Sequence, residues 1–367
     1  MVFQIIVTTA CNLNCKYCFE GEKTKSLFFR KEDLPELTAF MKNYVLNDFV
    51  LEKKIYINFN GGEALLNKEF LFFATNYFKQ NGIENFSLST NLTILSEDII
   101  NFLIDNDIKI QISIDGKKKT HDENRIDLSG KPTFKSVYKN IKLLQRRISK
   151  DNLSFNLVFT NKSVFNLYKN VKFLLKKKIY PLSITINSLE VWEKNKFKVL
   201  DSEIHKIGLL YEKFYKKKIA VKIKLFNQTI ECLVAGMSKY RCGAIKDMIA
   251  ILPNSDILVC ESFIGDKNYN DYCIGSFKKG IDMQKINYFL RPDFICEEKC
   301  NSCSYNENCE HDCFASNRRI TGTDCCISPF LCEINKIYLN ETYRIMKSLL
   351  KNKNFTFIKE YFRGNAK

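Results

Sequence analysis

Strand-like apolar segments alternate with amphipathic helical segments through the first two-thirds of the chain. The strand-like segments lie at residues 3–7, 54–59, 85–89, 109–114, 153–159 and 182–186. The helical patterns lie at residues 33–49, 68–80, 96–106, 134–148, 164–177 and 201–217. These six strand–helix units predict an α/β fold in which a parallel sheet carries helices on its outside. Their closure predicts a partial barrel with three-quarters of the strands of a TIM barrel.

Three cysteines follow the first predicted strand at the spacing C-x₃-C-x₂-C, namely Cys11, Cys15 and Cys18. Three thiolates on one short loop can hold three corners of a cubic iron–sulfur cluster. A fourth cysteine is missing nearby, so one iron would stay open, and an open position is typical of catalytic metal sites. The spacing therefore predicts a catalytic iron–sulfur centre. A zinc loop, or three unrelated cysteines, is the alternative.

The cysteines are distributed unevenly along the chain. Of 15 cysteines, three lie at positions 11–18, none at 19–231 and twelve at 232–332. Clustered cysteines in a reducing compartment favour metal binding over disulfides. We therefore expect two metal-binding regions. The expected parts are a barrel at residues 1–225, a small cysteine-rich α+β domain at 226–335 and a C-terminal helical tail at 336–367.

Composition indicates a cytoplasmic protein that does not enter membranes. The chain has 367 residues, of which 45% are hydrophobic, and it lacks both a long apolar run and a signal peptide pattern. Its net charge of +16 would suit RNA or an acidic peptide as a partner. Lysine triplets at residues 176–178 and 216–218 end predicted helices, where they complement the helix dipole. A general lysine excess is therefore favoured, and nucleic acid is not the expected partner.

The run from Cys11 to Cys18, with Tyr17 before its last cysteine, resembles the motif C-x₃-C-x-Φ-C of the radical SAM superfamily, in which Φ is aromatic. The resemblance implies the same partial barrel. It also implies that the open iron binds the amino and carboxylate groups of S-adenosylmethionine (SAM). One electron from the cluster then cleaves the sulfonium and releases a 5′-deoxyadenosyl radical.

A glycine-rich loop follows the second predicted strand, at the strand end where the chemistry of such barrels lies. Gly61, Gly62 and Glu63 resemble the G-G-E-P motif of the superfamily, and Ala64 replaces the proline. The resemblance implies that this loop binds the amino group of the methionine moiety. Glycines allow a backbone to approach a ligand closely, so the change to alanine leaves the implied contacts in place.

Two later strands are followed by further cofactor-site candidates. Thr90 and Asn91 stand where the family often has T-N-G near the cofactor. Ser113 and Asp115, with Arg125 beyond, belong to a stretch that looks like the S-I-D-G…R pattern of the peptide- and protein-modifying branch. The resemblance implies that Ser113 lies near the cofactor carboxylate or ribose and that Arg125 pairs with this carboxylate in bidentate fashion. An ordinary surface arginine is the alternative for Arg125.

The cysteine-rich half resembles the SPASM extension of radical SAM enzymes, with the spacing C-x₂-C-x₅-C-x₃-C from Cys300 onward. The extension implies two auxiliary [4Fe–4S] clusters, and therefore three clusters in total. The implied ligands are Cys242, Cys260 and Cys313 for the first, and Cys300, Cys303, Cys309 and Cys332 for the second. Met237 stands where the first set usually has its fourth cysteine. Either Cys273 or Cys232 could replace it, or this iron could be open to a substrate thiolate.

The SPASM branch acts largely on peptides and proteins. Residues 260–267 look closer to maturases of ribosomally synthesised peptides than to sulfatase-activating enzymes. We expect an oxidoreductase that abstracts hydrogen from a short ribosomal precursor peptide and forms a thioether or a related cross-link. A flavodoxin or ferredoxin is the expected reductant. Because the first strand begins near Phe3, leader recognition is expected from a separate protein, from the basic surface or from the C-terminal helix.

Two alternatives stay open. The first is an anaerobic sulfatase maturase, which oxidises cysteine or serine to formylglycine. In that family an acidic residue after the cysteine equivalent to Cys260 is a proposed base, which makes Glu261 the expected catalytic residue. The second alternative is an RNA-binding protein with structural zinc sites. An iron–sulfur protein is brown and a zinc protein is colourless, so colour separates these classes.

Overall fold

The computed structural model describes residues 1–21, 26–187, 190, 192–236, 242–291, 300, 302–309 and 313–362. These residues belong to two compact units, each described by itself. Unit 1 comprises Met1–Ile114, His121–Ser154 and Gly243–Phe294. Unit 2 comprises Asp115–Thr120, Phe155–Cys242 and Ile295–Lys367. Among the predicted features, Met237 lies outside the described residues.

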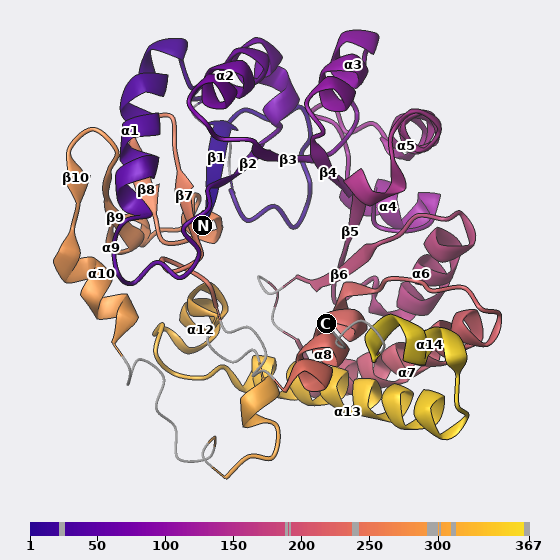
Figure 1. Cartoon of the computed structure of the whole chain (residues 1–367). Coiled ribbons are helices and arrows are strands. Elements are labelled where there is room, and N and C mark those ends of the chain that lie inside the picture. The colour runs from indigo at the N-terminus through magenta and orange to yellow at the C-terminus, as the bar shows by residue number, and fades with distance from the viewer. Residues whose placement is uncertain are drawn as a thin grey trace. The chain divides into compact units, whose positions relative to one another are not determined.

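Unit 1 is built on a sheet with a parallel half and an antiparallel half (Figure 1). The parallel strands are β1 (Val2–Thr8), β2 (Tyr56–Gly61), β3 (Asn85–Thr90) and β4 (Lys109–Ser113). β1 also pairs in parallel with β7, which continues into the antiparallel strands β8, β9 and β10. These last four are β7 (Met248–Ile251), β8 (Asp256–Leu258), β9 (Cys273–Ser276) and β10 (Gly280–Ile281).

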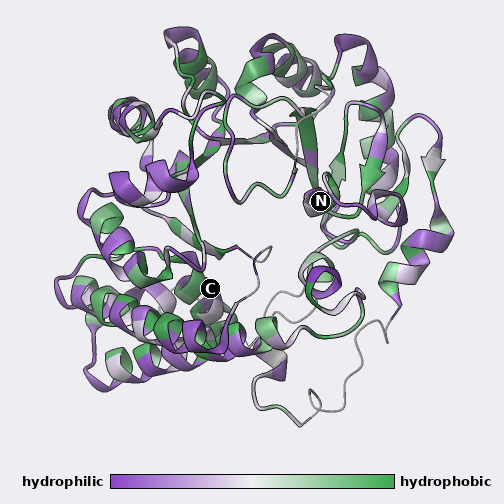
Figure 2. Cartoon of the chain, turned by 180° about the vertical axis from the view of Figure 1, so that it is seen from behind, coloured by the Kyte–Doolittle hydropathy of each residue, from purple (hydrophilic) through white to green (hydrophobic). Residues whose placement is uncertain are grey.

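Burial explains why β1 lies inside the sheet. Six of its seven residues are buried, as expected for a parallel strand that is covered on both faces. The helices of unit 1 lie outside this sheet and carry both hydrophobic and hydrophilic residues (Figures 1 and 2). They are α1 (Leu34–Tyr44), α2 (Lys68–Gln80), α3 (Glu97–Asp105), α5 (Phe134–Arg147), α9 (Tyr269–Tyr272) and α10 (Met283–Leu290). A further helix, α4 (Lys118–Asn124), follows β4.

Unit 2 combines a parallel strand pair with a helical group. β5 (Leu153–Phe159, in this unit from Phe155) pairs with β6 (Leu182–Ile186). The helices are α6 (Leu167–Lys176), α7 (Lys194–Lys216), α8 (Lys224–Ala235), α12 (Phe314–Thr321), α13 (Pro329–Lys351) and α14 (Phe355–Tyr361). α13 is joined to α7 by Arg344, whose guanidinium lies 2.6 Å from both Glu212 and Glu341. α14 is joined to α7 by Tyr361, whose hydroxyl lies 3.1 Å from that of Tyr211.

The predicted α/β fold and its parallel sheet are confirmed, and β5, β6 and α2 have the predicted bounds. Several predicted helix bounds differ from the structure by one to three residues, and two are wrong by five residues or more. α1 ends at Tyr44 rather than at residue 49. α7 begins at Lys194 rather than at residue 201, because Phe197 on the added turns packs against Phe330 with ring centroids 5.9 Å apart. No helix in the described ranges is long and apolar enough to cross a membrane.

We predict that Gly116 is essential to the turn after β4. Its φ is +109°, and a Cβ there would lie 2.3 Å from the Cβ of Asn170. The Asn170 side chain accepts the Lys117 N–H at 3.1 Å, so it cannot simply move away. Gly116→Ala should lower the free energy of unfolding by about 3 kcal/mol in urea denaturation. Gly130 also has a positive φ, of +79°, but open space around it.

Gly130→Ala is therefore the matched control and should cost about 1 kcal/mol. Equal losses in the two variants would show that the Asn170 contact does not restrict residue 116.

Candidate functional site

The loop after β1 carries the three N-terminal cysteines and is fixed by its backbone. The N–H of Asn14 donates to the carbonyl of Ile126 at 2.8 Å, and that of Lys16 donates to the carbonyl of Asn124 at 3.0 Å. Within the loop, the Cys18 N–H donates to the Cys15 carbonyl at 3.1 Å and closes a turn. The two backbone hydrogen bonds that join this loop to residues 124 and 126 are therefore made by Asn14 and Lys16, which stand between the cysteines.

The three thiols have properties that suit iron. Cys11, Cys15 and Cys18 are partly exposed and form no disulfide. The Leu13 N–H lies 3.4 Å from the Cys11 sulfur, and the side-chain amide of Asn91 lies 4.0 Å from it. The thiolate form of cysteine is the form that binds iron. The residues present fit a cluster with three cysteine ligands, although no three Cys, His, Asp or Glu side chains in the described ranges already stand in metal-binding geometry.

The glycine loop after β2 lies directly against the segment that leads to Cys11. A Cβ on Gly61 would lie 2.2 Å from the Thr8 carbonyl oxygen, and one on Gly62 would lie 2.3 Å from that of Ala10. The Gly62 N–H donates to Thr8 at 3.0 Å, and the Glu63 N–H donates to Ala10 at 2.9 Å. Only glycine fits at both positions. The structure thus brings together two motifs that are about fifty residues apart in the chain.

Glu63 is buried, with 2% of its surface exposed, and its carboxylate connects the strand ends. One oxygen accepts the Thr90 hydroxyl at 2.7 Å, and the other accepts the Asn91 N–H at 2.7 Å. The side-chain amide of Asn91 donates in turn to Asn12, within the cysteine loop, at 3.0 Å. Glu63, Thr90 and Asn91 therefore form one hydrogen-bonded group at the carboxyl ends of β2 and β3. A direct contact of Glu63 with the cofactor stays a prediction.

Arg125 lies above one of the predicted cofactor-site residues. Its guanidinium carbon is 5.3 Å from the centroid of the Tyr17 ring, an arrangement that allows a cation–π interaction. Arg125 is buried, which excludes the surface-arginine alternative. Ser113 ends β4 and is half-buried. Asp115 is buried in unit 2 and accepts the Val158 N–H at 3.2 Å, a contact that supports the strand β5.

Glu261 stands beside the glycine loop. It follows Cys260, and its carboxylate accepts a hydrogen bond from the side-chain amide of Asn60, which directly precedes Gly61. Protein atoms surround the carboxylate and raise its pKa to about 7. The charge of Glu20 acts in the same direction, whereas the hydrogen bond from Asn60 lowers the pKa.

Sequence reasoning missed Asn60 and Glu20. Asn60 is adjacent to the glycine motif, which was its only sequence signal. Glu20 lies two residues after Cys18, and its carbonyl oxygen would be 2.3 Å from a Cβ on Gly265. The chain that leaves the cysteine loop therefore packs tightly against the chain that follows Glu261.

Two of the four cysteines implied for the second auxiliary cluster lie in one turn. The Cys303 N–H donates to the Cys300 carbonyl at 3.1 Å and closes a turn. Cys332 lies in the first turn of α13, where its N–H donates to the Ser328 carbonyl at 3.1 Å. In the first implied set, Cys260 belongs to unit 1, whereas Cys242 and Cys313 belong to unit 2. Cys273 lies in unit 1, where its thiol donates to the Gly275 carbonyl at 3.4 Å.

We predict that the Thr90 hydroxyl stabilises the buried Glu63 carboxylate. Thr90→Val keeps the shape of the side chain but removes the donor at 2.7 Å, and should lower the free energy of unfolding by about 2 kcal/mol. Thr90→Ser keeps the hydroxyl and should retain most of the stability. Chemical denaturation of anaerobically prepared protein measures both. Equal stability of the valine and serine variants would contradict this role.

Residues 5–174 match the family model described as the Radical SAM superfamily. Among curated proteins, the cysteine-type anaerobic sulfatase-maturating enzyme of Clostridium novyi is 26% identical over 328 residues, which cover 83% of this chain and 84% of that protein. The radical SAM cyclopropyl synthase TigE of Paramaledivibacter caminithermalis is 21% identical over 369 residues, covering 95% of this chain and 75% of that protein.

Two solved structures have a similar fold. Native anSMEcpe with bound AdoMet superposes with a TM-score of 0.78 at 18% identity, covering 95% of this chain and 99% of that one. SuiB of Streptococcus suis, bound to the precursor peptide SuiA, superposes with a TM-score of 0.59 at 17% identity, covering 90% of this chain and 75% of that one.

Proposed function

We propose that this chain, whose residues 5–174 match the Radical SAM superfamily model, is a radical SAM maturase that forms a thioether or a related cross-link in a ribosomally synthesised precursor peptide. The observation that carries the proposal is the arrangement in unit 1. The loop of Cys11, the glycine loop at Gly61 and the carboxylate of Glu261 are joined by direct contacts. SuiB, which is similar to this chain in fold, is bound to its precursor peptide SuiA, and this supports a peptide as the class of substrate.

Each group of residues has one part in this proposal. Cys11, Cys15 and Cys18 would hold the SAM-binding cluster, which with SAM supplies a 5′-deoxyadenosyl radical for hydrogen abstraction. The glycine loop and Glu63 would hold the methionine end of SAM, and Arg125 its carboxylate. Their role is to fix the cofactor relative to the substrate and to exclude water.

Glu261 would take up the proton that leaves the substrate. Its raised pKa, about 7, and its bond to Asn60 place a carboxylate with appreciable basicity next to the glycine loop. The two auxiliary clusters, held by the cysteines of the C-terminal region, would accept the electron left by cross-linking. The fourth ligand of the first of these clusters, whether Cys273, Cys232 or a substrate thiolate, is part of the same proposal. The flavodoxin or ferredoxin donor and the cytoplasmic location remain predictions.

The second candidate function is sulfatase maturation. The similarity to the Clostridium novyi enzyme over 83% of this chain favours it, as does an acidic residue after Cys260. Mass spectrometry of the product separates the two. A thioether retains sulfur and loses two hydrogen atoms, whereas conversion of cysteine to formylglycine replaces the sulfur by an aldehyde oxygen. The test substrates are a short cysteine-bearing peptide and a sulfatase, and a gene for either one beside this gene would favour the matching function.

We predict three [4Fe–4S] clusters, which amount to about 12 iron atoms per chain. Replacing Cys11, Cys15 and Cys18 together by alanine should remove about one third of the iron, since one cluster of three is lost. The same variant should no longer convert SAM to 5′-deoxyadenosine. Iron analysis and chromatography of the reduced protein measure both effects. An iron content of about four or fewer in the reconstituted wild type would rule out the auxiliary clusters.

Glu261→Gln should uncouple SAM cleavage from peptide modification. The amide still accepts a hydrogen bond from Asn60 but takes up no proton, so 5′-deoxyadenosine should form while the modified peptide falls by about 100-fold. Glu261→Asp should restore part of the activity. Glu97→Gln, which changes an exposed glutamate of α3, is the control for the change in charge. Full modification by the Glu261→Gln variant would remove Glu261 from the mechanism.

A further inference from the structure

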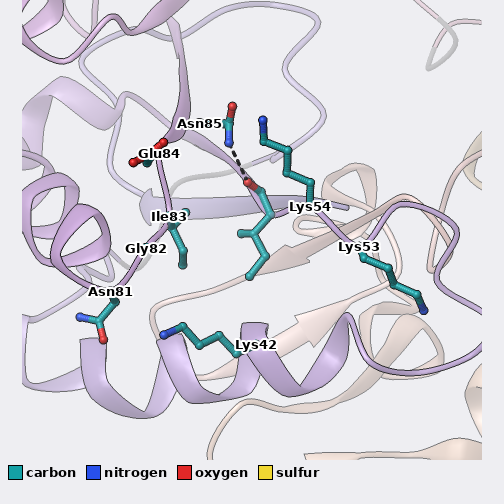
Figure 3. A pocket seen from close by; sticks show the side chains of 9 residues that line it. Lys42, Lys53, Lys54, Asn81, Gly82, Ile83, Glu84 and Asn85 are labelled. Carbon is teal, nitrogen blue, oxygen red and sulfur yellow. Dashed lines mark hydrogen bonds between the residues drawn. The ribbon is translucent and has the colours of Figure 1, made fainter.

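A pocket of about 280 Å³ lies in unit 1 beside the first residues of β2 and β3, which are the ends opposite the glycine loop. Figure 3 shows the residues that line it. It forms where the loop between α1 and β2 meets the loop between α2 and β3. Lys42, Lys53 and Lys54 line it, together with Glu84 and Asn85. We propose that this pocket binds an acidic segment of the peptide substrate, an inference that rests on the proposed function.

The walls of the pocket are fixed by the fold. The side-chain amide of Asn85 donates to the Ile55 carbonyl at 3.4 Å and joins the two loops (Figure 3). Gly82 follows α2 with a φ of +79°, a left-handed conformation common after helix ends. Ile83 is buried, and its N–H donates to the Phe78 carbonyl at 3.0 Å. A ligand would therefore meet a preformed shape, which lowers the entropy lost on binding.

The three lysines of the pocket form few interactions with the rest of the protein, so their positive charge is available to a ligand. Lys53 donates to the Asn47 carbonyl at 2.9 Å, and the Lys54 ammonium lies 5.6 Å from the Tyr56 ring centroid. In the described part of the chain, no ion pair joins Lys42, Lys53 or Lys54 to a carboxylate. Each ammonium has three N–H donors, so capacity for an anion remains. Glu84 is the single acid of the lining.

Apolar side chains beside the lysines favour a peptide over a nucleic acid. Leu46 is 73% exposed, and Leu51 is 70% exposed. Both belong to the loop that carries Lys53, and the carbonyl that Lys53 binds is that of Asn47, next to Leu46. Phosphodiester backbones would leave these leucines in water, whereas a peptide with acidic and apolar residues pairs with both kinds of side chain. Such a peptide is complementary both to the charge of the lysines and to the apolar surface of the leucines.

One peptide can reach from this pocket to the reaction site. β2 has six residues, so its two ends lie about 20 Å apart at about 3.3 Å per residue. An extended peptide covers that span with about six residues, and a path around the sheet takes about ten. A leader segment held in the pocket would thus raise the local concentration of the residue to be modified.

Binding of three synthetic probes tests this inference without SAM or reductant. The probes are fluorescein-labelled peptides in which leucine alternates with glutamate, glutamine or lysine, and fluorescence anisotropy gives Kd. The pocket variant is Lys42→Gln, Lys53→Gln and Lys54→Gln together. Its matched control replaces Lys213, Lys216 and Lys217, exposed lysines at the end of α7, by glutamine, and thus changes the net charge equally.

We expect the wild type to bind the glutamate probe most tightly. The pocket variant should raise its Kd by about tenfold, and the control variant by less than about twofold. Basal conversion of SAM to 5′-deoxyadenosine with dithionite should be the same in all three proteins, which shows that they are folded. Equal losses in the two variants, or equal Kd values for the glutamate and glutamine probes, would overturn the inference. The proposed function fails by a separate result, namely that the wild type modifies no peptide.

Discussion

The buried carboxylate of Glu63 is the interaction on which the candidate site depends. Removing an ionised carboxylate from water costs several kcal/mol unless donors replace the lost hydration. Here the donors are the Thr90 hydroxyl, the Asn91 N–H and the Leu65 N–H. Since these donors follow two neighbouring strands, the carboxylate fixes the spacing of their ends. The cysteine loop joins the same network through Asn91, whose side-chain amide donates to Asn12 at 3.0 Å and lies 4.0 Å from the Cys11 sulfur.

Local patterns in the sequence were enough to predict the parallel strands and the first two motifs. The cysteine spacing and the Gly-Gly-Glu loop are each contained within a few residues, and their neighbourhood follows from the rule that parallel strands end at the same edge. The contact of Asn60 with Glu261 could not be predicted in this way, because 201 residues separate them. It depends on β7 pairing with β1, a long-range contact that no local pattern reports.

The helix α7 shows a different limit of sequence reasoning. Its first turns are rich in lysine, and the predicted helix began only at residue 201, where aspartate is a favourable N-cap residue. In the folded chain Phe197 packs against Phe330 and Trp192, so tertiary burial extends the helix beyond its local signal. The region expected as one cysteine-rich domain is divided between the two units. Strands β7 to β10 belong to unit 1, and helices α12 to α14 belong to unit 2.

The pairing of β1 with β7 means that two segments far apart in the chain, at residues 2 and 248, form one sheet. β1 is synthesised well before its second neighbour, which begins at residue 248. Until that segment has been synthesised, one whole edge of β1 carries unpaired N–H and carbonyl groups on a highly apolar strand, which is the kind of edge that promotes aggregation. A fragment cut before the cysteine-rich region would keep this exposed edge permanently, so the two halves of the chain are not separable modules.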